Sequence, residues 1–245
     1  MSASGLTDPY LKLDWAKRHL EALDADLETF HKSNPCRFSS EDDFENQRYI
    51  LRVELDQVPD HIPLRCGDAF YCMRACLDQL VWRLAKLNIT IPDGRVKFPV
   101  IEKWDNDSRG RFKVQLRDVP PDAIAIIRDL QPANGTAPVE SHHLWRLNAM
   151  CNLDKHRRIP ANGSEVLFHL PIGDPTAVTF ETFDDCGIMT VPLADKSKLN
   201  FNPNVTFQVN FGDKTARVVL GPTDIRDIYK FLSDSVLPRF VRFFP

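Results

Sequence analysis

Four residues in the segment 67–87 combine charge with aromatic surface at helical spacing: Tyr71, Arg74, Asp78 and Trp82. Residues three or four apart lie on the same side of a helix, so these four share one face. Arg74 and Asp78 can form an ion pair, which contributes only about 0.3–0.5 kcal/mol if it is exposed. Alternatively, an arginine that is held by a carboxylate and flanked by aromatic rings is suited to bind a phosphate or a carboxylate. The spacing alone leaves both interpretations open.

A second helical segment, 144–158, carries polar residues on one face. Asn148 and Asn152 are four residues apart, and Trp145 precedes Asn148 by one turn. Asparagine is a poor helix former because its side chain competes for backbone hydrogen bonds. Two asparagines on one face therefore indicate a hydrogen-bonded seam between helices or a binding site. The segment ends in a basic run of Lys155, His156, Arg157 and Arg158. Cations stabilise a helix C-terminus, so this run also has a purely structural interpretation.

The elements that would position these residues are mostly helical up to Pro160. Apolar residues recur at helical spacing over 8–32, 67–87, 121–130 and 139–156. A half-buried strand is predicted over 49–56 because apolar and polar residues alternate there. A polar loop is predicted over 34–46, and the segment 92–119 is interpreted as mixed and rich in loops.

Short runs rich in β-branched and aromatic residues replace the helices after Pro160. They cover 166–168, 178–183, 188–191, 205–211 and 216–220, with a hairpin turn at 212–214 and a last helix over 224–236. Helices followed by strands are typical of an α+β fold. We therefore expect a mainly helical part with one early strand over 1–160. It would pack with an antiparallel sheet and a C-terminal helix from 161–245, in one integrated domain.

Common cofactor and metal motifs are missing from the sequence. It has no phosphate-binding P-loop, no dinucleotide-binding glycine fingerprint, no serine nucleophile elbow and no H-E-x-x-H. The six cysteines form no C-x-x-C pair, which favours reduced, buried thiols. His142 and His143 are adjacent, and adjacent helical residues point about 100° apart, so they do not chelate one ion together. We expect no cofactor and no metal site.

The charge and the chain ends restrict the partners. The net charge of −3 predicts no general attraction to nucleic acid or to anionic membranes. The segment 1–10 is polar, and no run of about 18 apolar residues could span a bilayer. We expect a cytoplasmic protein without a membrane partner. The terminal phenylalanines 240, 243 and 244 would pack back onto the domain or form a homo-oligomer contact.

Two stretches of the sequence together resemble a widespread group of uncharacterised bacterial proteins. The first, GDAFYCMRACLDQLVWRLA, has the pattern R-x-x-L-D-x-L-V. The second, HHLWRLNAMCNLDKHRRI, has the pattern L-W-x-L-N-x-x-x-N-x-D-K-H-R. An F-P segment, here Phe98-Pro99, often lies between them. The resemblance covers about residues 65–160 and implies a bacterial protein, but it assigns no activity.

The second helix is also similar to the signature of HEPN-type helical domains, many of which are metal-independent RNA endonucleases of toxin and phage-defence systems. In that signature an Arg, often followed by Asn, precedes a His by four to six residues. Asn152 and His156 match it, whereas Cys151 stands in place of the Arg. The resemblance implies that His156 is a general acid or base on a ribose 2′-OH, with an arginine stabilising charge on the phosphate. The arginines that could replace the missing one are Arg74, Arg146 and Arg157.

The function that we favour from the sequence is a non-enzymatic binding or regulatory module. In this interpretation the Arg74–Asp78 pair connects to Asn148, Asn152 or His156 and forms a polar network between two helices. Buried polar groups need hydrogen-bond partners, and such a network can fix how helices pack. This hypothesis predicts short side-chain contacts and no open pocket.

Two enzymatic alternatives use the same residues. In an RNA-cleaving or RNA-binding protein, the catalytic residues Arg74, Asn152 and His156 would converge in one cleft, with RNA as the partner. In a hydrolase or transferase, a concave site lined by aromatic side chains would take a small molecule. The candidate binding residues across these hypotheses are Tyr71, Asp78, Trp82, Trp145, Asn148, Lys155 and Arg157.

Overall fold

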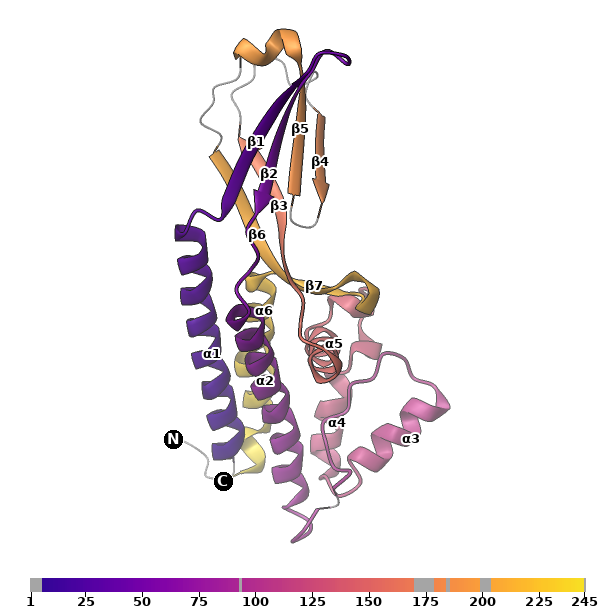
Figure 1. The fold of residues 1–245 in the computed structure, drawn as a ribbon. Helices are drawn as coiled ribbons and strands as arrows, with labels where there is room; N and C mark the ends of the chain where they lie inside the picture. The colour runs from indigo at the N-terminus through magenta and orange to yellow at the C-terminus, as the bar shows by residue number, and fades with distance from the viewer. Residues whose placement is uncertain (1–5, 93, 170–178, 184–185, 199–203, 245) are drawn as a thin grey trace.

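The α+β fold predicted from the sequence is confirmed by a computed structural model, which describes residues 6–92, 94–169, 179–183, 186–198 and 204–244 (Figure 1). Its α-helices are α1 (Thr7–Lys32), α2 (His61–Ala85), α3 (Asn106–Gln115), α4 (Pro121–Asp129), α5 (His143–His156) and α6 (Pro222–Lys230). After α6 the chain continues in a π-helical turn, η7 (Phe231–Val236), and a 3-10 segment, η8 (Leu237–Phe243). Within the described residues, every helix is too short or too polar to span a membrane.

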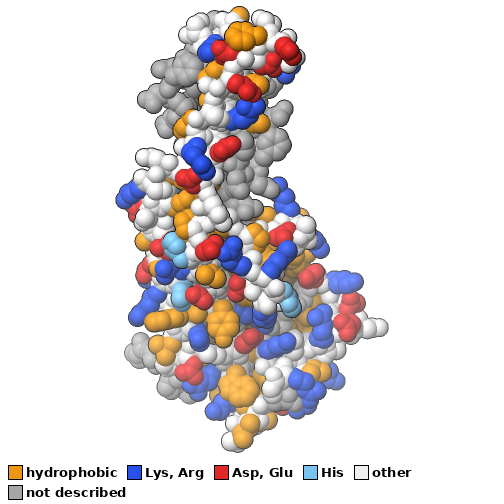
Figure 2. Space-filling model, in the orientation of Figure 1, with side chains coloured by type: hydrophobic (Ala, Val, Ile, Leu, Met, Phe, Trp, Pro, Cys, Tyr) orange, Lys and Arg blue, Asp and Glu red, His pale blue; other side chains and the backbone are white. Residues whose placement is uncertain are grey.

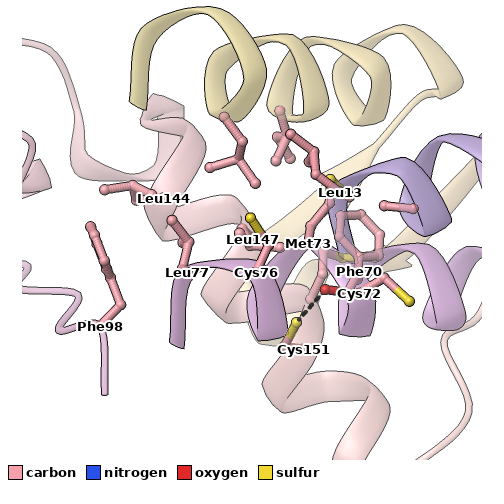
Figure 3. Close-up of a cluster of buried hydrophobic side chains, with 14 of the residues drawn as sticks. Leu13, Phe70, Cys72, Met73, Cys76, Leu77, Phe98, Leu144, Leu147 and Cys151 are labelled. Atoms are coloured by element: carbon pink, nitrogen blue, oxygen red, sulfur yellow. Dashed lines mark hydrogen bonds between the residues drawn. The ribbon is translucent and has the colours of Figure 1, made fainter. Parts of the chain in front are cut away.

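Helix α2 is the centre of the helical part and packs against both α1 and α5 (Figure 1). Its apolar stripe, which includes Phe70, Met73 and Leu77, is fully buried. Phe98 and Leu144 belong to the same core as Leu77, and Figure 3 shows these side chains gathered around α2. A fully buried side chain of this size contributes about 1.5–3 kcal/mol relative to its exposed state, so this core fixes α2 firmly.

The described strands form two antiparallel sheets. The larger sheet has the order β1-β2-β5-β4, formed by β1 (Cys36–Asp43), β2 (Arg48–Leu55), β5 (Cys186–Pro192) and β4 (Thr179–Phe183). The smaller sheet has the order β3-β6-β7, formed by β3 (Ala161–His169), β6 (Asn204–Asp213) and β7 (Val218–Leu220). In Figure 1 the larger sheet extends away from the helices. Among the side chains that the structure describes, its own buried cluster consists of Tyr49, Leu51, Met189 and Val191.

Several sequence predictions differ from the observed elements. The loop predicted over 34–46 is wrong, because β1 occupies most of it and pairs with β2. Helix α2 begins at His61 rather than at residue 67, since Pro63 lies in the first turn, where no helical N–H is needed. The loop-rich segment 92–119 contains α3. Residue 178, within the strand predicted over 178–183, lies outside the described residues.

The ends and the thiols of the chain are consistent with a well-packed domain. Phe240 and Phe244 are buried in the main core, so these two pack back onto their own chain. Four of the described cysteines are free and buried: Cys66, Cys72, Cys76 and Cys151. Cys36 is free and partly buried, and the side chain of Cys186 lies outside the described part.

Candidate functional site

A cavity of about 350 Å³ lies along α2 where it faces α5; we call it the α2–α5 pocket. It is lined by Tyr71, Arg74, Ala75, Asp78, Gln79, Trp82, Val96, Cys151, Asp154 and Lys155. Its volume is at the lower end of the range that small-molecule sites occupy. Four of the residues predicted on one face of the first polar helix, Tyr71, Arg74, Asp78 and Trp82, therefore do share one site.

Arg74 is held in a fixed position in this pocket. Its Nη2 donates to Asp78 Oδ1 at 2.8 Å and to the carbonyl oxygen of Phe98 at 2.5 Å. The backbone N–H of Phe98 donates in turn to Asp78 Oδ1 at 2.9 Å. The Arg74 side chain is only 13% exposed. The predicted ion pair is thus present, but it also ties α2 to the segment that carries Phe98.

Two polar atoms of the pocket residues are buried without a partner in the described part of the chain. They are Nη1 of Arg74, a donor, and Oε1 of Gln79, an acceptor. A buried polar group without a hydrogen bond costs about 1–3 kcal/mol, and more if it is charged. Both residues line the pocket, but these two atoms lie behind its surface, where a water-sized molecule does not reach them. The sequence analysis missed Gln79, whose only signal is a polar residue next to Asp78 inside an apolar segment.

Aromatic and apolar side chains form the rest of the wall. Tyr71 is 62% exposed and Trp82 is 37% exposed, which is unusually open for aromatic residues on a core helix. Lys12 Nζ lies 5.7 Å from the centre of the Tyr71 ring. Val96 is buried and also lines the pocket. These surfaces suit the flat apolar body of a ligand, whose polar group would meet Arg74.

Cys151 contributes a neutral surface rather than a nucleophile. Its thiol donates to the carbonyl oxygen of Phe70 at 3.3 Å (Figure 3). Burial raises its pKa to about 12, although the nearby Arg74 acts in the opposite direction. The thiolate is the reactive form of cysteine, so this thiol is inert near neutral pH.

Asp154 and Lys155 bring charges of both signs to the same pocket. Burial, and secondly the carboxylate of Asp68, raises the pKa of Asp154 above its ordinary value. The Asp154 carboxyl lies against α2 at Gly67, where an added Cβ would come within 2.6 Å of Oδ1. Lys155 is exposed at the rim. With Arg74 and Asp78, the lining therefore carries two cations and two acidic groups.

A second cavity, also of about 350 Å³, lies on another side of α5; we call it the α5 outer groove. It is lined by Glu102, Trp145, Asn148, Ala149, Asn152, Leu153, His156, Arg157 and Ala216. Asn152 and His156 are exposed. The guanidinium of Arg157 pairs with Asp213 Oδ2 at 2.6 Å. The Arg217 guanidinium carbon lies 5.7 Å from the centre of the Trp145 ring.

The predicted site residues are thus divided between two cavities. Arg74 lines the α2–α5 pocket, whereas Asn152 and His156 line the α5 outer groove, so the three do not share one cleft. Within the described residues, no hydrogen bond joins the Arg74–Asp78 pair to the polar face of α5. The reason is the helical repeat of 3.6 residues. Cys151 and Lys155 face α2, which turns Asn148, Asn152 and His156 to a different side.

No family model, curated protein or solved structure matches this chain in the comparisons. No group of three or more potential metal ligands occurs in the part of the chain that the structure describes.

Proposed function

We propose that this chain is a non-enzymatic binding module whose α2–α5 pocket holds a small ring-bearing ligand through a polar oxygen. The cavity that Arg74 shares with the exposed rings of Tyr71 and Trp82 carries this proposal. Hydrogen bonds that involve a charged donor are about twice as strong as neutral ones. An oxygen of the ligand would accept a hydrogen bond from the Arg74 guanidinium, while Tyr71 and Trp82 would pack against the ring.

The fixed position of Arg74 supports binding. Its Nη2 already has two partners, in Asp78 and Phe98, so little side-chain freedom remains to be lost when a ligand arrives. Ordering a free side chain on binding costs about 0.5–1.5 kcal/mol, and a preformed site avoids that cost.

The acid–base properties of the lining favour binding over catalysis. Cys151 is protonated near neutral pH because burial raises its pKa to about 12. An activated nucleophile needs an adjacent base or a lowered pKa. Burial raises the pKa of Cys151 instead of lowering it, and its thiol donates to the backbone carbonyl of Phe70.

Titration with a small set of aromatic amides and acids, followed by NMR, tests this proposal. Arg74→Met should weaken binding more than tenfold, because a charged hydrogen bond contributes about 1.5–3 kcal/mol. Arg83→Met is the matched control, since Arg83 is on the same helix but pairs with Asp8 outside the pocket.

A second variant fills the α2–α5 pocket with a larger side chain and leaves its polar residues unchanged. Ala75 lines the pocket and is partly exposed, so Ala75→Leu should fold normally and block the ligand. Binding that survives both Arg74→Met and Ala75→Leu would contradict the proposal, as would the failure of every probe to bind the unaltered protein.

RNA cleavage at the α5 outer groove is a second candidate function. Asn152, His156 and Arg157 line this groove together, and His156 is exposed to a substrate. His156 would act as general acid or base on the ribose 2′-OH, as the HEPN resemblance implies. Arg157 would have to leave Asp213 to contact the phosphate. Cleavage of RNA in EDTA that His156→Ala abolishes would support this function, and no cleavage by either protein would count against it.

A cytoplasmic location and a bacterial source belong to the same proposal. The buried free thiols of Cys66, Cys72, Cys76 and Cys151 support the location, because reducing compartments keep thiols unpaired. The bacterial source is supported by the resemblance of the two polar helices alone.

A further inference from the structure

Strand β1 lies at the edge of the larger sheet and carries a row of unpaired backbone groups. Within the described residues, its strand partner is β2 alone. The Asp56 N–H donates to the Pro35 carbonyl at 2.7 Å, so every second residue counted from Pro35 is hydrogen-bonded to β2. The backbone groups that point away from β2 are therefore those of Cys36, Phe38, Ser40 and Asp42. Such a row is a template for pairing with another strand.

The outer edge of β1 is accessible to a second copy of the chain. The side chains of residues 37–41 are exposed, and Phe38 among them is 47% exposed. In Figure 1 the sheet projects from the helices, and β1 begins next to α1 and runs away from it. An antiparallel copy of β1 would run back toward α1. The helices of the second copy would therefore lie beyond the far end of β1, clear of the helices of the first.

One antiparallel register pairs the whole row of outward-facing groups. It places Ser39 opposite Ser39 of the second copy, on a two-fold axis. Cys36 then faces Asp42 of the second copy, and Phe38 faces Ser40, so each outward-facing residue meets another outward-facing residue. A shift of the register in either direction leaves Cys36 or Asp42 beyond the end of the opposite strand.

The same register is favoured by charge. It sets Arg37 opposite Glu41 of the second copy, and symmetry repeats this contact. Opposite charges that face each other across a strand pair stabilise it. Within one chain, Arg37 pairs with Asp56 at 2.7 Å and Glu41 pairs with Arg52 at 2.6 Å. The new contacts would join these pairs into rows of alternating sign, and Figure 2 shows acidic and basic side chains interspersed along the projecting part of the molecule.

From these features we infer that two copies of this chain dimerise by pairing β1 with β1 about an axis at Ser39. The two larger sheets then form one continuous sheet. None of the residues that line the α2–α5 pocket or the α5 outer groove belongs to β1. The dimer therefore goes beyond the proposed binding function and does not depend on it.

Sedimentation velocity over a range of protein concentrations tests this inference, and the unaltered protein should approach twice the mass of one chain. Ser40→Pro is the first variant. The Ser40 N–H points away from β2, so proline keeps the β1–β2 ladder but removes a donor from the outer edge and adds a ring there. We expect this variant to be monomeric, with the circular dichroism of the unaltered protein.

An exchange of charges tests the register independently. Arg37→Glu should weaken dimerisation about tenfold, because symmetry turns two attractive contacts into repulsive ones. Adding Glu41→Arg to this variant should restore the dimer. An unaltered protein that stays monomeric, or a dimer that survives both Ser40→Pro and Arg37→Glu, would overturn the inference. If Ser40→Pro changes the circular dichroism, the charge exchange decides, and a double variant that is no stronger a dimer than Arg37→Glu refutes the pairing.

Discussion

The carboxylate of Asp78 connects Arg74 on α2 to the backbone of Phe98. We therefore predict a large loss of stability in Asp78→Ala. One oxygen, Oδ1, accepts from Arg74 Nη2 at 2.8 Å and from the Phe98 backbone N–H at 2.9 Å. Removing it leaves the Arg74 guanidinium, only 13% exposed, without its counter-ion. It also leaves the Phe98 N–H without this partner.

The expected size of this loss follows from the two bonds. A hydrogen bond to a charged group contributes about 1.5–3 kcal/mol, and a fully exposed ion pair contributes about 0–1 kcal/mol. Asp78 lies between these cases because its side chain is 38% exposed. We therefore expect the free energy of unfolding to fall by about 2–3 kcal/mol. For a chain of this length, that lowers Tm by about 5–10 °C.

Urea unfolding followed by circular dichroism measures this change. Asp14→Ala is the matched control, because Asp14 and Arg18 form the same kind of pair at the same spacing on an exposed helix face, at 3.5 Å. The control should stay within about 0.5 kcal/mol of the unaltered protein. If Asp78→Ala costs no more than Asp14→Ala, the link through Phe98 is not a stabilising feature.

Three further predictions concern the surroundings of the site. Iodoacetamide at pH 8 should leave Cys151 unmodified until urea unfolds the protein, because burial raises its pKa to about 12; rapid labelling of the folded protein would contradict this. Burial lowers the pKa of His142 and His143, so the stability that depends on their neutral forms is complete above the unfolded pKa of about 6.5 and is lost as the pH falls below it. In a variant with both residues replaced by Asn, the free energy of unfolding should therefore depend less on pH between 7.5 and 5. Gly67→Ala should lower the free energy of unfolding by no more than about 1 kcal/mol, because the atom that its Cβ would meet at 2.6 Å, Asp154 Oδ1, is the end of a side chain that can rotate away; a larger loss would show that the carboxyl is held in place.

The helical core was predictable because its pattern is local. The stripe from Phe70 to Leu84 repeats at helical spacing and is buried as that pattern requires. The strand β1 was missed because its side chains are mostly exposed, so apolar and polar residues do not alternate along it. It forms through pairing with β2, and that pairing is not visible in its own residues.

The sequence was enough to predict which polar residues share a face of each helix, but not which residues of other elements that face contacts. Helical spacing placed Asn148 and Asn152 on one face with Lys155 or His156. Of these two, His156 lines one groove with the asparagines, and Lys155 lines the other cavity. The spacing could not show that this face turns away from Arg74. Gln79 was missed for a related reason, because an unpartnered acceptor is defined by tertiary contacts rather than by sequence.

A crystal of the protein soaked with 4-bromobenzamide tests binding at Arg74 most directly, because the anomalous signal of bromine locates the ring without any assumption about the site. We predict a bromine peak in the α2–α5 pocket between Tyr71 and Trp82, with the amide oxygen within hydrogen-bond distance of the Arg74 guanidinium. The peak should be missing in Ala75→Leu crystals. A peak only in the α5 outer groove, or no peak with the pocket open to solvent, would contradict the assignment of this pocket as the binding site.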